Sequence, residues 1–363
     1  MKLQKLIAAL SVLLLLLTAA IGCGNRNNVF TEEVSSGPVS PATETSDGSG
    51  ALPQDYKVLK VVNFLPAGHQ DNIALETVFK PMLEEMTEGR YLVEIYPDST
   101  LSPLGGEEGF IRAIEKGTVE MGIAGVILSE QYPRLKVIDF PWVFDDVESS
   151  FNALTDPEIQ KDINRDIAEA GILCKGFVLS GVRSVSNNVR PIYTLEDCKG
   201  ITLRMPAVSQ FIDGTQALGF DTVNLPMPQI FIALQQGVVD GQENPPTTML
   251  QAGWYEVQKY LSLTKHQVTY NWLAVNKSFY ESMTKEDQKA FDHCCDVYEQ
   301  KVKELYLERE QEDLNELKSK GVQINEVDRA PFKEAGYAVV EQYCQKYPEF
   351  NDILTKLRRK GAK

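Results

Sequence analysis

The sequence predicts an α/β fold built from two units, each a mostly parallel sheet with flanking helices. The first observation is that short apolar runs alternate with helical segments between residues 58 and 124, which is the pattern of strand–helix–strand units. The second is that the same alternation returns between residues 157 and 246. The third is a helical stretch from Thr284 to Lys320, about 55 Å long at 1.5 Å per residue, which is too long for one small unit.

The first unit is predicted to run strand, helix, strand, helix, strand. The strands are expected at residues 58–65, 91–96 and 119–124, and the helices at about 72–87 and at 107–116. Pro81 should kink the first helix, because proline lacks an N–H and clashes with the preceding turn. Gly117 is placed to end the second helix.

The second unit repeats this order. Asp156 is expected to cap a helix that starts at Pro157. We expect helices at residues 157–170, 207–218 and 228–236, strands at 172–180, 201–205 and 238–239, and a loop at 240–246. Thr284 and Asp287 resemble a capping box at the start of the long helix, which Gly321 ends. This helix is expected to lie across both units.

The charge of the chain limits its partners. It contains 36 Lys and Arg residues against 51 Asp and Glu residues, a formal net charge of −15. Nucleic-acid and anionic-membrane binding both need a basic surface, so we expect no nucleic-acid partner. An anionic ligand would have to be attracted by local groups, which is tolerable because physiological salt screens the overall field within about 8 Å.

The N-terminus is typical of an export signal. Lys2 and Lys5 precede an apolar run that ends in Ala-Ile-Gly before Cys23, which resembles a bacterial lipobox. We predict a lipoprotein signal peptide at residues 1–22, lipidation of Cys23 and a disordered tether at residues 23–55, which are rich in Ser, Pro, Thr and Gly. The alternative is a transmembrane anchor, for which the apolar run is at the short limit. Either places the chain outside the cytoplasm, held to a membrane surface.

Cysteine and histidine patterns argue against a metal site. The five cysteines past Cys23 are Cys174, Cys198, Cys294, Cys295 and Cys344, and none has metal-ligand spacing. We expect small buried side chains, although a Cys174–Cys198 bridge, or one from Cys344 to Cys294 or Cys295, is open in an exported protein. The three histidines lie far apart, and HExxH, GxSxG, GxxxxGK[ST] and GxGxxG motifs are missing. We therefore expect no cofactor and no enzyme activity.

Arg204 is the strongest candidate for ligand binding. It lies in the predicted strand 201–205, on the face opposite Leu203. Arginine is poorly placed in a buried strand unless it has a partner. Its guanidinium can fork onto a carboxylate through two hydrogen bonds. The alternative is a salt bridge to one of the many acids of this chain.

Other polar residues follow predicted strands, where ligands bind in open α/β sheets. Arg183 follows the strand 172–180 through Gly181, with a hinge or a surface ion pair as the alternative. Asn244 could donate to a ligand oxygen or cap the turn before Pro245. The weaker candidates are His69 and Asn72 after the first strand, with Met227 and Trp142 as walls of the pocket.

Around these residues the sequence resembles the solute-binding proteins of TRAP transporters, the DctP-like family. The resemblance is strongest in GVRSVSNNVRPIYTLEDCKGITLRMP, IALQQGVVDGQENP and WYEVQKYLSLTKH, between residues 181 and 266. It is weaker from residues 58 to 144 and covers essentially everything past the tether. The second of these motifs is specific.

The resemblance implies a two-lobed periplasmic-binding-protein-like fold with a long helix spanning both lobes. The ligand would lie in a cleft that closes on it, and the closed form would be passed to a membrane permease. The carboxylate-clamping arginine of the family falls on Arg204, its second cleft arginine on Arg183 and its ligand-contacting asparagine on Asn244. The chain departs from the family pattern at Gln229, where Glu is frequent, and at Met227, where an aromatic residue is sometimes found.

We therefore predict an extracytoplasmic receptor that captures a small organic acid for a TRAP permease. Lobe I is expected at residues 56–180 plus about 270–309, and lobe II at residues 181–269 plus about 310–363. One alternative is a ligand-sensing lipoprotein of the same fold that feeds a signalling partner. Another is an extracellular enzyme on an α/β scaffold, since fold does not fix function, although no nucleophile–base pair is visible.

Overall fold

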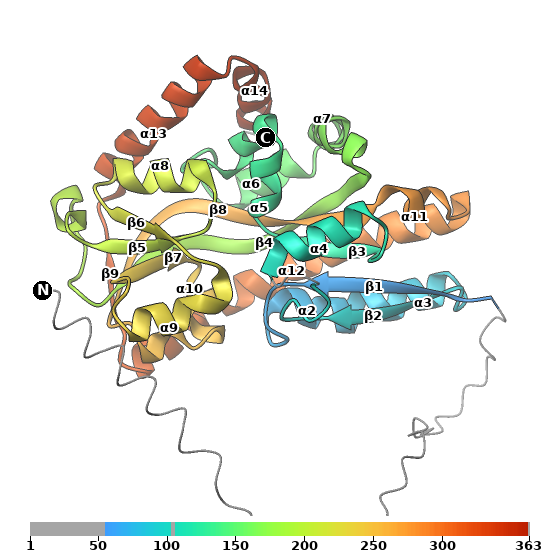
Figure 1. Ribbon diagram of the computed structural model, residues 1–363, viewed down its shortest axis with the longest axis horizontal. Coiled ribbons are helices and arrows are strands. Elements are labelled where there is room, and N and C mark those ends of the chain that lie inside the picture. The colour runs from blue at the N-terminus through green and yellow to red at the C-terminus, as the bar shows by residue number, and fades with distance from the viewer. Residues whose placement is uncertain (1–54, 103–105, 362–363) are drawn as a thin grey trace, which may run out of the picture. The chain divides into compact units, whose positions relative to one another are not determined.

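One mixed sheet organises the protein. The computed structural model describes residues 55–102 and 106–361 (Figure 1). Within these residues the strand order is β2-β1-β3-β8-β4-β7-β5-β6, with β9 paired to β8. The strands are β1 Lys57–Asn63, β2 Tyr91–Tyr96, β3 Met121–Ala124, β4 Ile172–Asn187, β5 Thr202–Met205, β6 Asp221–Asn224, β7 Gly241–Asn244, β8 Tyr260–Asn276 and β9 Gln323–Glu326.

Helices flank this sheet. The α-helices are α2 Gln70–Ala74, α3 Lys80–Met86, α4 Gly106–Glu115, α5 Ile127–Gln131, α6 Val147–Leu154, α7 Pro157–Ile167, α8 Ser209–Ala217, α9 Ile230–Gln235, α10 Pro246–Gln251, α11 Lys277–Glu281, α12 Lys285–Ser319, α13 Arg329–Lys346 and α14 Glu349–Gly361. The π-helical turn η1 is Leu75–Phe79, and the 3₁₀ turns are η2 Pro133–Asp139, η3 Ala168–Ala170, η4 Leu195–Cys198, η5 Met227–Gln229 and η6 Trp254–Glu256. Among the described residues, no helix is long and apolar enough to cross a membrane.

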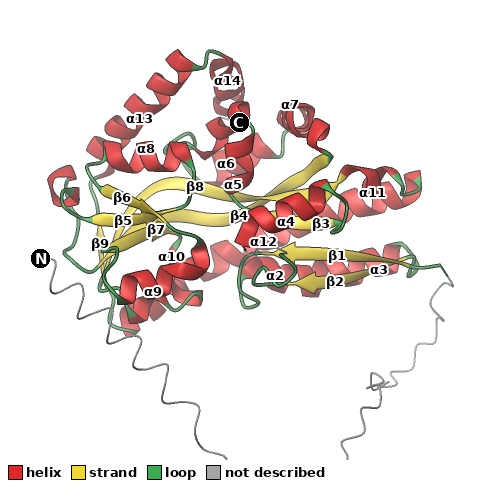
Figure 2. Ribbon diagram, in the orientation of Figure 1, coloured by secondary structure: helices red, strands yellow, loops and turns green. Residues whose placement is uncertain are grey.

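The sheet has two parallel halves, as predicted. In the first half β1 pairs in parallel with β2 and β3, and in the second half β5 pairs in parallel with β6 and β7. Two long antiparallel strands, β4 and β8, join the halves (Figure 2). The antiparallel pairings of β3 with β8 and of β4 with β7 complete the sheet.

Two strand predictions are wrong. The strand expected at 172–180 continues to Asn187, so Arg183 lies inside β4 and not after it. No strand forms at the expected position, Val238–Val239. The strand is instead β7, which lies in the segment predicted to be a loop. The polar β7 segment extends because β4 and β5 flank it and pair with its backbone. Gly241 permits this approach, since a Cβ at that position would overlap the carbonyl oxygen of Ser186.

The kink predicted at Pro81 takes the form of a π-helical turn. The expected helix divides into α2, η1 and α3, and the N–H of Lys80 bonds to the carbonyl oxygen of Leu75. Proline cannot supply the N–H of a regular α-helical ladder, and an irregular turn on its N-terminal side accommodates this loss.

The long helix is confirmed as α12. Thr284 caps it, with the hydroxyl oxygen accepting a hydrogen bond from the N–H of Asp287 at 3.1 Å. Gly321 follows the helix with a φ of 96°. On one side α12 packs against α2 and α3, and on the other against α10, while β4 lies along it. It therefore contacts both halves of the sheet, as predicted.

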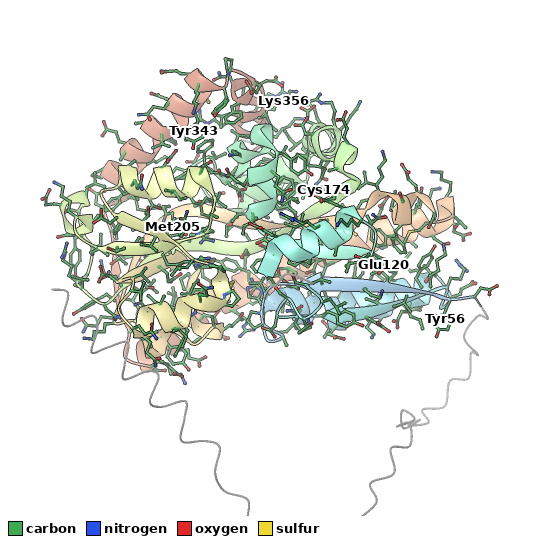
Figure 3. The ribbon with its side chains drawn as sticks, in the orientation of Figure 1. Tyr56, Glu120, Cys174, Met205, Tyr343 and Lys356 are labelled. Carbon is green, nitrogen blue, oxygen red and sulfur yellow. The ribbon has the colours of Figure 1, made fainter. Side chains whose placement is uncertain are left out.

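Helix α13 packs over the second half, against α8, whereas α14 packs against α6 and η2. Tyr343 of α13, labelled in Figure 3 with Lys356 of α14, donates a hydrogen bond of 2.6 Å to Asp213 on α8. The predicted signal peptide, Cys23 and all but the end of the tether lie outside the described residues. Within them, all five cysteines are buried and free, so none of the three possible disulfides forms.

Candidate functional site

A cavity of about 730 Å³ lies where the strand ends of both halves meet. Its lining comes from residues that follow β1, β2 and β3, from residues at or after the ends of β5, β6 and β7, and from the middle of β4 and β8. Ligand pockets of proteins typically enclose about 300–1,000 Å³. The carboxyl ends of the strands therefore form the candidate site, as expected for an open α/β sheet.

Arg204 lines this cavity from β5 and has an incomplete set of partners. The side chain is 5% exposed, and its Nε donates a hydrogen bond of 2.7 Å to the carbonyl oxygen of Leu225. Among the described residues, no acceptor lies within bonding distance of its two terminal nitrogens. Burial lowers the pKa of Arg204 to about 9, with Glu243 opposing the change and Arg183 adding to it. The guanidinium remains a cation at neutral pH and has two nitrogens available to an anion.

Arg183 also lines the cavity, but Glu243 neutralises it. Its Nε lies 2.5 Å from Oε2 of Glu243, and its Nη2 donates to Oε1 at 2.7 Å and to the carbonyl oxygen of Glu243 at 2.6 Å. Nε2 of His266 lies 3.1 Å from the same carboxylate. Burial alone would raise the pKa of Glu243, but Arg183 and His266 outweigh it and hold the pKa at about 2. The alternative of an ion pair for Arg183 is thus realised, in a buried form.

Asn244 and Met227 complete the predicted residues that reach the cavity. Asn244 is the last residue of β7, and its Nδ2 donates a 2.6 Å hydrogen bond to Oε1 of Gln242. Gln242 in turn donates to the hydroxyl of Ser186 at 2.8 Å. These two hydrogen bonds hold the amide of Asn244 in place and leave its oxygen and one N–H hydrogen for a ligand. Met227, in η5, adds an apolar wall.

The structure places His69, Asn72 and Trp142 outside the lining of this cavity. His69 caps α2 and lies 3.1 Å from Asp71, fully buried. Asn72 donates to the carbonyl oxygens of Leu65 and Pro66, so it supports a loop of the cavity from behind.

Trp142 is displaced by packing. Its ring lies against Gly336 of α13, where a Cβ would overlap it. Its backbone N–H donates to the carbonyl oxygen of His266 at 3.0 Å, while the indole Nε1 is buried without a hydrogen-bond partner among the described residues. The sequence placed Trp142 in a wall of the pocket, whereas its packing against α13 keeps it out of the cavity lining.

Sequence reasoning missed Glu107, which lines the cavity from α4. Its Oε1 is buried and has no hydrogen-bond partner among the described residues. Burial raises the pKa of Glu107 to about 8, although the amides of Gly125 and Ile127 oppose this. Glu107 therefore carries a proton at neutral pH. An acidic residue in the first turn of a helix is common, so the sequence offered no signal.

The charge balance of the cavity favours an anion. Arg204 is a cation, the Arg183–Glu243 pair is neutral, and Glu107 is protonated at neutral pH. The remaining acids of the lining, Asp98 and Glu108, are exposed, so solvent screens them. No group of three or more His, Cys, Asp or Glu within the described residues could hold a metal ion.

Comparison with known proteins identifies the family of this chain. The family model of the bacterial extracellular solute-binding proteins, family 7 (DctP), matches residues 61–346. The chain belongs to this family. Family 7 and its structural neighbours are extracytoplasmic binding proteins of transporters.

Two relatives and one solved structure illustrate the similarity. A solute-binding protein of Roseobacter denitrificans is 32% identical over 258 residues, or 71% of this chain and 78% of the relative. The 2,3-diketo-L-gulonate-binding periplasmic protein YiaO of Escherichia coli is 27% identical over 76% of this chain and 84% of its own length. A crystal structure of a TRAP periplasmic solute-binding protein from Haemophilus influenzae with bound L-gulonate has a TM-score of 0.78 and 30% identity, covering 84% of this chain and 99% of the other. The match to this solved structure confirms the two-lobed fold.

Proposed function

We propose that this protein is the extracytoplasmic receptor of a TRAP transporter and that it captures a small organic acid on Arg204. The observation that carries the proposal is a buried arginine with two unpaired terminal nitrogens in a cavity of about 730 Å³. A carboxylate would satisfy both nitrogens through a bidentate pair. The ligand then supplies the counter-charge that the protein itself does not.

We further propose sugar acids as the first ligands to test. Relatives of this chain bind L-gulonate or 2,3-diketo-L-gulonate. The cavity lining offers hydroxyl and amide groups that suit a polyhydroxylated chain: Ser180, Asn224, Asn244, Thr248, Gln251, Thr269 and Asn271. Such groups fix the orientation of a ligand by hydrogen bonding.

Capture would proceed by closure of two lobes around the ligand. We propose the lobe bounds predicted from sequence, which place the crossings near residue 180 on β4 and residue 270 on β8. The register of these strands shifts between Leu179 and Gly181, which supports a boundary there. Ligand contacts from both lobes exist together only when the cleft is closed, so the ligand shifts the population toward the closed form.

Lipidation of Cys23 would hold the receptor at the membrane surface, where its partner is the permease. The tether, residues 23–55, would give the folded part reach. The family is extracellular by description, which agrees with export.

A thermal-shift screen tests the proposal. Residues 51–363, one compact unit, would be mixed with a panel of organic acids that includes L-gulonate. A ligand at 100 times its dissociation constant should stabilise the protein by about 2.7 kcal/mol. Arg204→Lys should lose this stabilisation, because an ammonium cannot form the bidentate pair. Arg204→Ala should cost about 2–5 kcal/mol of binding free energy.

The control is Arg359→Lys, since Arg359 is 62% exposed on α14. It should keep the ligand response of the wild type. An equal response of the Arg204→Lys variant and the wild type would remove Arg204 as the anchor. If no acid in the panel stabilises the wild type, the ligand is not a simple carboxylate and the proposed class is wrong.

A further inference from the structure

The long helix α12 buries three polar side chains at intervals of seven residues. Glu299, Tyr306 and Asp313 are 5%, 1% and 3% exposed. Seven residues make nearly two helical turns, so the three side chains share one face of the helix. Each bonds to a group outside the helix: the N–H of Phe177, the N–H of Val182 and the hydroxyl of Thr247. Burying a polar group is unfavourable unless it is hydrogen-bonded. The partners of these three side chains indicate what they do.

Tyr306 supports an irregular point in β4. Between Leu179 and Gly181, β4 advances two residues while its partner β8 advances one. Such a bulge removes a backbone group from the ladder and redirects the strand. The hydroxyl of Tyr306 accepts the N–H of Val182 at 3.1 Å and donates to Oε1 of Glu310 at 3.1 Å. Tyr306 thereby gives this N–H an acceptor beside the cavity, at a residue that the pairing of β4 with β7 does not reach.

The residues on either side of this bond belong to the site. Ser180, the extra residue of the bulge, and Arg183, which follows Val182, both line the cavity, whereas Tyr306 does not. The position of Arg183 relative to the cavity therefore depends on where the backbone of Val182 is held.

Asp313 makes a similar contact at the start of α10, next to Asn244. Its Oδ2 accepts the hydroxyl proton of Thr247 at 2.6 Å, with both side chains buried. Thr247 lies in the first turn of α10, three residues after Asn244. Neither Thr247 nor Asp313 lines the cavity.

Gly181 shows how closely these parts meet. A Cβ at this residue would lie 2.6 Å from Cε2 of Tyr306 and 2.9 Å from Cβ of Pro245, the neighbour of Asn244. Its φ of 135° also favours glycine. The strand β4, the β7–α10 junction and α12 therefore touch at one point with no spare volume.

We propose that Tyr306 and Asp313 are positioning residues that set Arg183 and Asn244 for ligand binding. This inference rests on the proposed function for its ligand readout. The hydroxyl of Tyr306 accepts the hydrogen bond of the Val182 N–H, and the carboxylate of Asp313 fixes the start of α10 through Thr247. An unpaired buried N–H costs more than the hydrogen bond contributes, so the local backbone moves when Tyr306 loses its hydroxyl.

Tyr306→Phe is the first test, with Tyr280→Phe as the matched control. Tyr280→Phe removes one hydroxyl hydrogen bond, to Asp292 of α12 at 2.7 Å, where Tyr306→Phe removes two, and Tyr280 lies away from the cavity lining. With L-gulonate, or another acid that stabilises the wild type, as the probe, Tyr306→Phe should raise the dissociation constant roughly three- to tenfold. Tyr280→Phe should leave it within about twofold. Equal dissociation constants for the two variants would overturn the role of Tyr306, whatever their melting temperatures.

Substitutions of Thr247 test the role of Asp313, because valine removes the hydroxyl and serine restores it. Thr247→Val keeps the shape and removes the hydroxyl, which leaves the Asp313 carboxylate without that donor. It should weaken binding of the same acid about tenfold or more, and Thr247→Ser should restore it to within about threefold. A valine variant with wild-type affinity, or a serine variant as weak as valine, would refute the role of Asp313.

Amide hydrogen exchange in the ligand-free protein separates this inference from the proposed function. The Val182 amide should exchange at least about tenfold faster in Tyr306→Phe than in wild type or Tyr280→Phe, because its acceptor is gone. Unchanged exchange refutes the inference even if acids bind. Faster exchange in a protein that binds no acid supports the positioning contact and rejects only the proposed ligand class.

Discussion

Glu299 should make the protein less stable as the pH rises. Its side chain is 5% exposed and accepts the N–H of Phe177, at a second register shift of β4. Burial raises the pKa of Glu299 from 4.5 to about 8; the Phe177 amide lowers it in part and Asp296 raises it further. Because the folded pKa is above the unfolded value, the stability present below pH 4.5 is lost as the pH rises toward 8.

The size of this effect follows from the pKa difference. Each pKa unit corresponds to 1.36 kcal/mol, so the carboxyl of Glu299 should lower the free energy of unfolding by about 3 kcal/mol at pH 7 relative to pH 4. Glu299→Gln keeps an acceptor for the Phe177 amide and removes the ionisation. This variant should therefore exceed wild-type stability by about 3 kcal/mol at pH 7 and match it within about 1 kcal/mol at pH 5.

Urea unfolding at pH 5, 6, 7 and 8 measures this difference. Glu308→Gln is the control, because Glu308 lies on the exposed surface of the same helix. Its unfolding free energy should follow that of the wild type at every pH. If the Glu299→Gln and wild-type curves run parallel from pH 5 to 8, Glu299 does not ionise on unfolding and the reasoning from its burial fails.

Three further outcomes are expected. Gly181→Ala should cost about 2–3 kcal/mol of unfolding free energy, because its φ is 135° and a Cβ would lie 2.6 Å from Tyr306; an unchanged urea midpoint would contradict this. Thr284→Ala should cost about 1 kcal/mol through loss of the cap on the Asp287 amide, visible as a lower melting temperature, and an unaltered melting temperature would argue against the cap. The five buried cysteines should not react with a thiol reagent at pH 8 until urea is added, since burial raises their pKa; one reactive equivalent in the native protein would show an accessible thiol.

Local patterns were sufficient for most helices and for the parallel halves. The N-cap at Thr284 and the stop at Gly321 define α12, because capping depends only on neighbours in sequence. Arg204 was identified as an unusual charge in a buried strand, and the structure puts it in the cavity. A buried charge in an apolar strand is a signal that needs no knowledge of its surroundings.

Local sequence patterns could not predict contacts between residues that lie far apart in the chain. Arg183 pairs with Glu243 across 60 residues, which explains why sequence alone left its partner open. Glu107 reaches the cavity only because α4 is packed beside the strand ends. His69, Asn72 and Trp142 stand at plausible positions along the chain, but their partners turn them toward the interior.

Patterns among residues a few positions apart specify the alternation of strands and helices, the long helix and the arginine on β5. The tertiary fold decided that β4 and β8 cross between the halves, because a strand pairs wherever its backbone groups and buried faces find partners. It also decided which charges cancel and which remain. Arg183 meets a carboxylate in the folded chain and Arg204 does not, and this difference leaves one uncompensated cation in the cavity.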